Sequence, residues 1–395
     1  MASSTNESGS QAKRLKIDDS DLFAAFHDTY LSENPSFLDA VDKFKQEMTA
    51  FGAFEIGSCN AITADPDNGY CFTKADCTLR PTQKKYAFAN FFFDGFKMLK
   101  TFITKQEIPK DSQLRLVLGR LVRFLLDTEI QKGLSRTKEC CDETELTILL
   151  AFHLFSQLST SPHFTVDNRK ANQPKECPCR KRHGRIMYGD TSIGNLDVWH
   201  GRLDLIMEGA DVIVDSLDEE LETYTDVDRT VDVKQRLFED NSAGSTLVQV
   251  AAKTIVHSFY YRQIHPDHSN TLIPCIAVSH RVGLIFYLYD SVNDILLGST
   301  QFPLASFNPF QLNMTVIIAV WLVLNHKYLC SGFSLTDLED VPKAGFVDVA
   351  EDKINVYREE LQRGQVGTRR FDVVNLDPLS FVNSKFILSP MFEDL

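Results

Sequence analysis

The sequence lacks any long hydrophobic run. Its longest, MTVIIAVWLVL at 314–324, has about half of the roughly 20 residues that a membrane-spanning helix needs. We therefore expect a buried core helix there and no membrane span. The chain also lacks an apolar signal segment at its start, and its nine cysteines are irregularly spaced. These features favour a nuclear or cytoplasmic location, where the environment is reducing and thiols stay free, over secretion.

Three common catalytic and binding motifs are missing as well. The chain has no nucleophile elbow, no phosphate-binding glycine loop and no dinucleotide fingerprint. It shows no internal repeat either. A function has to be sought in other arrangements of polar residues.

Positive charge is scarce over the whole chain, whose formal net charge is −13. This argues against a nonspecific polyanion binder, because nucleic-acid affinity depends mainly on cationic contacts to phosphate. The charge is nevertheless uneven: residues 169–185 carry seven Lys and Arg against one acid, and 211–228 carry eight acids and no base. A local basic face could therefore contact DNA, and the alternative is a solvated loop of biased charge. The side chains selected for that contact are Arg180, Lys181, Arg182 and Arg185.

The first twenty residues differ in composition from the rest. The chain as a whole, with 395 residues of which 43% are hydrophobic, can bury a sizeable core. Residues 1–20 are polar and low in complexity, which predicts a disordered tail. Within it Lys13, Arg14 and Lys16 resemble a nuclear import signal that would bind an import receptor. The alternative is an idle basic patch.

The spacing of apolar residues changes along the remaining chain. Residues 21–140 show mainly helical spacing, with 54–85 the least regular part. From about residue 195, short β-branched segments predict three strands, a helix and then further strands. This order predicts an α/β fold in which a mixed sheet is flanked by helices. The predicted strands are 196–207, 210–216, 230–237, 271–279, 283–291 and 294–299, and the helix is 245–263.

The stretch RTVDVKQRL, 229–237, places an acid and a lysine inside an apolar strand. Side chains alternate along a strand, so Asp232 and Lys234 share one face while the valines beside them pack on the other. Asp204 is an acid inside a second apolar strand that precedes this one. An unpaired carboxylate in such a place is costly, so three polar groups converging at a strand edge indicate metal ligation or access to solvent.

This arrangement resembles the PD-(D/E)XK nuclease superfamily, in which an acid on one strand is followed by acid-x-lysine on a neighbouring strand. The resemblance implies a restriction-endonuclease-like α/β core at 141–300, followed by a helical extension at 301–395. It also implies Mg²⁺ or Mn²⁺ bound by Asp204 and Asp232, with Lys234 positioning the attacking water. The expected activity is metal-dependent hydrolysis of DNA phosphodiester bonds.

Two further site residues follow from the same resemblance. Family members often add an acid from the first core helix as a metal ligand, which here implies Glu145 or its neighbour Glu143. Gln249 resembles the glutamine that several members place near their site. The alternative is that Gln249, Lys253 and His257 form the ordinary polar stripe of their helix.

A second alignment takes 210–216 as the catalytic strand and pairs Asp215 with Asp204. Leu217 then stands where lysine belongs, and the chain would have kept the fold without the activity. The first alignment instead needs an acidic insertion of 18 residues, 211–228, which loop entropy tolerates. Two functions therefore stay open: a magnesium-dependent nuclease, and a noncatalytic scaffold that binds proteins or nucleic acid.

A separate cluster, CPCRKRH, brings Cys177, Cys179 and His183 within seven residues. Such ligands could hold Zn²⁺, but structural zinc sites usually show a two-residue or wider gap between cysteines. We therefore expect a basic loop with free thiols, and zinc is the alternative. A fourth ligand would come from Cys140, Cys141 or His163.

Overall fold

The computed structural model describes residues 19–48, 51–61, 71–140, 142–170, 172–179, 185–217, 244–279, 283–307 and 309–366. Nearly all of the predicted disordered tail, 1–20, lies outside these ranges. The predicted import residues Lys13, Arg14 and Lys16 lie outside them too.

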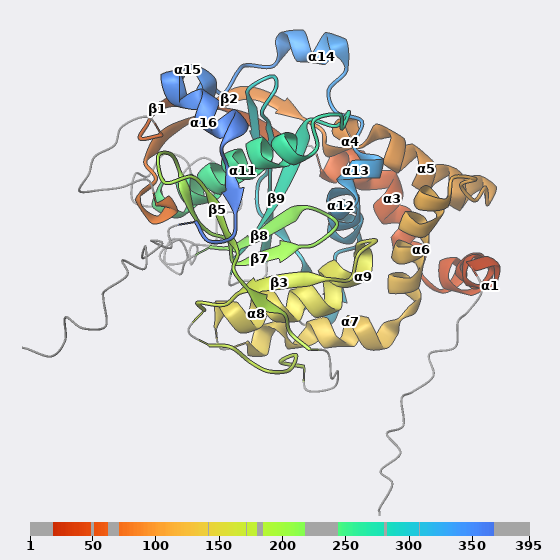
Figure 1. The fold of residues 1–395 in the computed structure, drawn as a ribbon. Coiled ribbons are helices and arrows are strands. Elements are labelled where there is room, and N and C mark those ends of the chain that lie inside the picture. Colours follow the sequence, from red (N-terminus) through yellow and green to blue (C-terminus); the bar gives the residue numbers. More distant parts are fainter. Residues whose placement is uncertain are drawn as a thin grey trace, which may run out of the picture.

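A ten-stranded mixed sheet forms the centre of the molecule (Figure 1), so the predicted sheet flanked by helices is confirmed. Its order is β2-β1-β11-β10-β9-β8-β7-β3-β4, and β12 pairs with β10. The bounds are β1 Phe51–Cys59, β2 Cys77–Tyr86, β3 Phe164–Asp167, β4 Tyr188–Gly189, β7 Leu205–Met207, β8 Val212–Ser216, β9 Leu272–Val278, β10 Gly283–Asp290, β11 Ile295–Gly298 and β12 Phe302–Pro303.

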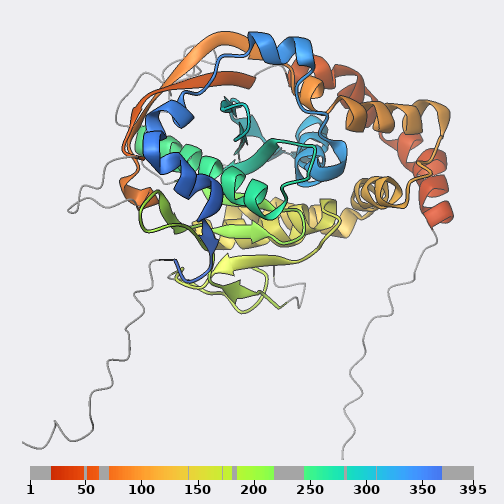
Figure 2. The ribbon, with the colours of Figure 1, turned by 45° about the horizontal axis from the view of Figure 1, so that its top comes forward.

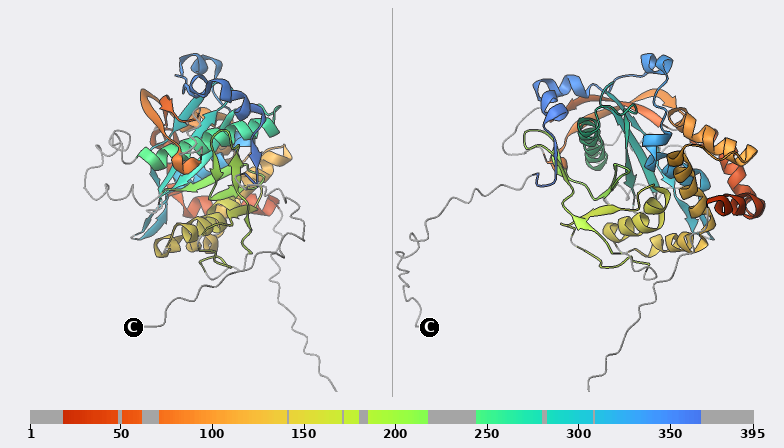
Figure 3. Two further views of the ribbon diagram at one scale, coloured as in Figure 1. Left: turned by 60° about the vertical axis from the view of Figure 1, so that its left-hand side comes forward. Right: turned by 45° about the vertical axis from the view of Figure 1, so that its right-hand side comes forward.

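Two hydrophobic cores lie on the two faces of this sheet. Strands β9 and β10 are buried along their whole length, as expected for strands covered on both faces. Their side chains alternate between the cores: Phe286 and Leu288 face one, whereas Tyr287 and Tyr289 face the other. Helix α11, Gly244–Ile264, covers the second face and α12, Met314–Leu324, the first (Figure 3).

Helix α12 is the apolar run that predicted a buried helix, and the structure confirms it. It is buried on all sides because the N-terminal helices cover the side that does not contact the sheet. Its Trp321 Nε1 donates to the Val117 carbonyl at 2.9 Å, which gives the buried indole a partner. Among the described residues, no helix combines the length and apolarity that a membrane crossing requires.

Helices dominate the N-terminal part, as predicted, and group on one side of the sheet (Figure 2), except η2, which packs against α11 on the other face. In α6 the apolar residues repeat at helical spacing, and Asp111 caps its start by accepting from two backbone N–H groups. The elements are α1 Asp19–Ala25, η1 Phe26–Tyr30, α2 Leu31–Glu33, α3 Pro35–Glu47, η2 Phe72–Lys74, α4 Phe88–Phe91, α5 Phe93–Lys105, α6 Ser112–Leu126, α7 Thr128–Leu134, η3 Ser135–Glu139, α8 Glu143–Leu150, η4 Ala151–Phe155 and α9 Ser156–Leu158.

Two strands that were not predicted occupy both ends of 54–85, the least regular part of the sequence; residues 62–70 lie outside the described ranges. Strands β1 and β2 form an antiparallel pair that joins the sheet beside β11 and arches along one side of the molecule (Figure 2). Strand β2 is largely exposed and carries Arg80, Pro81 and Lys84. Proline and exposed charges are typical of edge strands and hide the period-2 pattern that would have identified it.

In the described part of the predicted helical extension, residues 301–366, helices occur together with short strands; residues 367–395 lie outside the described ranges. The chain turns at Glu351, whose φ is 44°, and after α16 its strand β15 pairs with β5. Strand β5, Ser192–Gly194, also pairs with β6, His200–Arg202, so that β15, β5 and β6 form a small separate sheet. The C-terminal elements are β13 Ala305–Phe307, β14 Phe310–Leu312, α13 His326–Leu329, α14 Leu335–Asp340, α15 Phe346–Ala350, η6 Glu351–Lys353, α16 Ile354–Glu359 and β15 Gln362–Arg363.

Candidate active site

Two carboxylates lie at the open end of the β7–β8 hairpin. Asp204 directly precedes β7, and Asp215 is the next-to-last residue of β8. The strands pair antiparallel, with Leu205 opposite Val214, so the start of one lies beside the end of the other. The backbone N–H of Ser216 donates to Asp204 Oδ2 at 2.8 Å, and the Ser216 hydroxyl donates to the same oxygen.

A lysine from the helix after β8 reaches the same point. Helix α11 connects β8 to β9, which pair in parallel, so it crosses one face of the sheet (Figure 1). Lys253 on α11 donates to both carboxylate oxygens of Asp215, at 2.6 and 2.7 Å. The side chains of Lys253 and Asp215 are only 10% and 2% exposed. This is a buried ion pair between a strand and its crossover helix.

A second lysine compensates the other carboxylate. Lys170 Nζ lies 2.7 Å from Asp204 Oδ1, and both side chains are largely buried. Lys170 follows β3, the strand that pairs with β7. The two acids are therefore held by two lysines from different elements, and each acid also feels the charge of the other's lysine.

The charges of the four groups depend on one another. Burial raises the pKa of Asp215 to about 6, and the nearby Asp204 adds to that rise against the opposing effect of Lys253. Burial also disfavours the charge of Asp204, but Lys253 and Lys170 outweigh it and hold the pKa of Asp204 below its usual value. Burial likewise opposes the charge of Lys253, yet Asp215 and Asp204 raise its pKa. The lysine is therefore an ammonium at neutral pH.

These groups line a cavity of about 450 Å³, here called the Asp204 cavity. Glu143 reaches it from the start of α8, and Gln249 from α11, one turn before Lys253. Arg169 and His200 also line it. The lining thus combines several carboxylates with several cations, a composition suited to a metal ion and a phosphate group.

The structure brings Gln249 to the cavity, as predicted, but Glu145 does not line it. Glu143, the alternative acid, does. The two residues are neighbours at i and i+2 on α8, so their side chains point about 200° apart around the helix. The backbone N–H of Glu145 donates to Asp142, which is the N-cap of α8. Glu145 thus belongs to the capped helix start, where acids are common for reasons of the helix dipole.

Asp232 and Lys234 lie outside the described residues, as does the predicted strand 230–237. The carboxylate found beside Asp204 is Asp215, the residue of the second alignment. That alignment left no lysine, since position 217 is a buried leucine. In this register a lysine from α11, Lys253, contacts Asp215 instead.

Three of the four predicted DNA contacts, Arg180, Lys181 and Arg182, lie outside the described residues. Arg185 is exposed and does not line the Asp204 cavity. Earlier members of the same basic stretch, Arg169 and Lys170, do line it. Arg169 and Lys170 belong to the excess of basic residues at 169–185 that the sequence shows. Only the fold shows that the beginning of this stretch is the part that reaches the carboxylates.

Two other polar residues near the cavity, Arg202 and His257, have protein partners of their own. Arg202 lines the cavity but is paired with Asp167 at 2.5 Å and Asp190 at 3.1 Å. His257, in the predicted polar stripe of α11, donates through Nε2 to the Asp211 carbonyl at 2.8 Å and does not line the cavity. The polar stripe therefore divides: Gln249 and Lys253 face the acids, and His257 supports the hairpin turn.

Comparison with protein-family models, with curated proteins and with solved structures found no match to this chain. The functional argument therefore depends on the geometry and chemistry of the Asp204 cavity.

Proposed function

We propose that this chain is a Mg²⁺-dependent phosphodiesterase that cleaves DNA, with Asp204 and Asp215 as metal ligands and Lys253 as the cationic residue of the site. The observation that carries the proposal is the convergence of two buried carboxylates and a buried lysine in an open cavity. Such a cluster is expensive for stability alone, because each ion loses hydration. A cavity with perturbed pKa values is a typical functional site.

The order of elements around the cavity supports the same assignment. Helix α8 precedes β3, β7 and β8, which are antiparallel neighbours in the sheet, although β4, β5 and β6 are inserted between β3 and β7 along the chain. Helix α11 then leads to β9, parallel to β8. This order of helix, three strands, helix and strand resembles the PD-(D/E)XK core. The lysine departs from the usual strand position, since it lies on the helix.

The donor set suits a hard divalent cation. Two carboxylates, with Glu143 in the same cavity, supply the oxygen ligands that Mg²⁺ prefers. The pKa of Asp215 is raised because its charge is buried close to Asp204, and a divalent cation would relieve that cost. When bound, Mg²⁺ supplies a water of lowered pKa and polarises the phosphoryl oxygens.

The chain's own cations would orient the substrate and offset charge. Lys253 stays protonated at neutral pH in the metal-free protein, so its role is to orient the attacking water and stabilise negative charge, not to remove a proton. Arg169 is exposed at the cavity and Lys170 lies deeper within it. Both can contact the phosphates on either side of the scissile bond.

The test is a cleavage assay with purified protein, Mg²⁺ or Mn²⁺, a supercoiled plasmid and a single-stranded oligonucleotide. Asp204→Asn and Asp215→Asn should each reduce cleavage by about 100-fold or more, because the metal contributes several kcal/mol of transition-state stabilisation. Lys253→Met should reduce it comparably.

Two matched controls show whether the loss is specific. Asp211→Asn changes a carboxylate at the opposite end of the same hairpin, where it pairs with Lys327, and should retain cleavage. Lys234→Ala tests the first alignment. If Lys234→Ala abolishes cleavage while Lys253→Met does not, the assigned lysine is wrong.

The noncatalytic scaffold is the other candidate from the sequence. It predicts the same fold with no metal uptake at the Asp204 cavity. Titration calorimetry with Mg²⁺ separates the two, since a nuclease site should bind the ion in the parent and lose binding in Asp215→Asn. Absence of both uptake and cleavage in the folded parent protein would favour the scaffold.

A further inference from the structure

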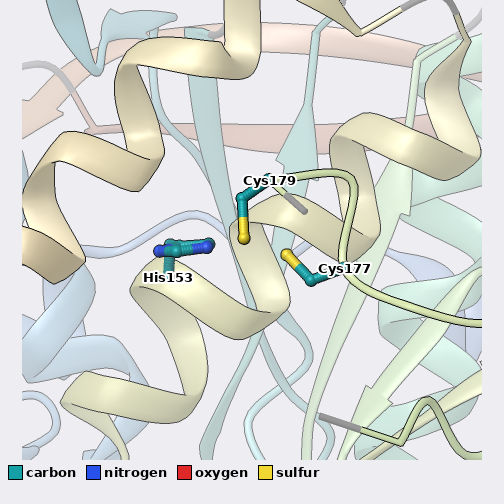
Figure 4. Close-up of side chains that lie close together, drawn as sticks. All are labelled: His153, Cys177 and Cys179. Atoms are coloured by element: carbon teal, nitrogen blue, oxygen red, sulfur yellow. The ribbon is translucent and has the colours of Figure 1, made fainter. Parts of the chain in front are cut away.

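A second cluster of metal-ligating side chains lies apart from the Asp204 cavity. His153, Cys177 and Cys179 are buried, and each offers one ligand atom within 4.8 Å of the others. The histidine comes from the π-helical turn η4, and the cysteines from the segment after β3. Figure 4 shows the two sulfur atoms turned toward the imidazole. The histidine predicted for this cluster, His183, lies outside the described residues.

The imidazole is oriented as a ligand would be. Its Nδ1 donates to the Ile130 carbonyl at 3.1 Å, and a carbonyl can only accept, so the neutral ring carries its lone pair on Nε2. Ligating histidines usually donate their second ring nitrogen to such a group. Gly133 makes room for this orientation, since a Cβ there would lie 2.0 Å from Nδ1.

The backbone at Cys179 is held by a contact from the neighbouring helical segment. Arg136, in η3, donates to the Cys179 carbonyl at 2.8 Å. The atypical single-residue gap that argued against zinc matters less here, because the third ligand comes from another part of the chain.

We propose that His153, Cys177 and Cys179 hold one structural Zn²⁺ ion. Two sulfurs and one imidazole nitrogen are a donor set typical of zinc, with bonds of about 2.3 and 2.0 Å. The fourth position is open to water or to Cys140, which follows η3 and contacts Arg136. The ion would fasten the segment after β3 to η4, the helical turn that continues α8.

This segment also carries part of the proposed active site. Arg169 and Lys170 lie between β3 and the two cysteines, and Lys170 pairs with Asp204. If the proposed function is right, loss of zinc should also loosen the Lys170 contact and lower cleavage. The zinc site itself does not depend on that function, because metal content is measured without any substrate.

The test begins with elemental analysis of the purified full chain, for which we expect about one zinc per chain. The double variant Cys177→Ser with Cys179→Ser should lose the metal, whereas Cys330→Ser, at a cysteine outside the cluster, should retain it. Co²⁺ replacing zinc should give thiolate-to-cobalt charge-transfer absorption in the parent and not in the double variant. A mercurial that modifies thiols should release about one zinc from the parent, a result that needs no variant to fold.

Three results would overturn the proposal. One is a folded parent that takes up no zinc after reconstitution and gives no charge-transfer band with Co²⁺. Another is a double variant that keeps its full zinc content. The third is a thiol titration showing Cys177 and Cys179 joined in a disulfide.

Discussion

The ion pair between Lys253 and Asp215 allows a quantitative test of the site. The substitution Lys253→Met keeps the length of the side chain and removes its charge. Asp215 is 2% exposed, so its carboxylate would then be buried beside Asp204 without the lysine that contacts both of its oxygens. Removing one partner of a buried pair typically costs about 3–5 kcal/mol, because the other charge is left uncompensated.

For a chain of this size, that cost should lower the melting temperature by roughly 5–10 °C, since one kcal/mol shifts domains of 150–250 residues by about 2–4 °C and larger chains by less. The assay is thermal unfolding without metal at pH 7.5, followed by circular dichroism. Adding Asp215→Asn to Lys253→Met should restore more than half of the loss, because the buried charge is then gone as well. The parent, the two single variants Lys253→Met and Asp215→Asn, and the double variant form a double-mutant cycle.

A second lysine provides the matched control. Lys327 also pairs with an acid of the hairpin, Asp211, but both side chains are 18% exposed. Lys327→Met should therefore cost less than Lys253→Met. The buried pair does not exist as described if Lys253→Met has the same melting temperature as the parent protein. The same follows if adding Asp215→Asn to Lys253→Met does not raise the melting temperature. Mg²⁺ should raise the melting temperature of Lys253→Met and leave the double variant unchanged.

Two further predictions concern the acids. The pKa of Asp215 is raised from a usual 3.8 to about 6 in the folded protein, so between these pH values the folded protein binds a proton that the unfolded chain releases. The contribution of Asp215 to the free energy of unfolding is therefore full below about pH 4 and is lost as the pH rises through 6. Asp215→Asn should flatten that slope in metal-free melts between pH 4 and 6.5, and Mg²⁺ affinity in the parent, measured by calorimetry, should fall as pH drops below about 6. Glu143→Gln should weaken Mg²⁺ binding or cleavage by about tenfold, as expected for a lost carboxylate ligand. Glu145→Gln, on the far side of the helix, should leave both unchanged. If the two variants bind Mg²⁺ and cleave equally well, Glu143 is not a ligand of the metal.

Local pattern was sufficient for much of the fold. Strands β3, β4 and β5, which precede residue 195, were not predicted. The continuous apolar strands β9 and β10 and the buried helix α12, in contrast, follow from side-chain spacing within one element. These predictions held because each depends on neighbours a few residues apart. The edge strands β1 and β2 were missed because exposure on an edge removes the alternation that marks a strand.

In the candidate site, too, local pattern identified one residue but not its partners. Asp204 was identified because an acid inside an apolar strand is costly wherever that strand lies. Its partners were not fixed by spacing: Asp215 and Lys253 are 38 residues apart and meet only because α11 crosses from β8 to its parallel neighbour β9.

The same holds for the proposed zinc ligands. Cys177 and Cys179 stand out in the sequence, but His153 is an ordinary residue of an apolar helix until η4 turns it toward them. Sequence by itself determined the buried strands β9 and β10 and the buried helices α11 and α12, since these depend on short-range periodicity. Only the tertiary structure decided which charged groups meet, because which helix face lies against which strand end is set by packing between distant parts of the chain.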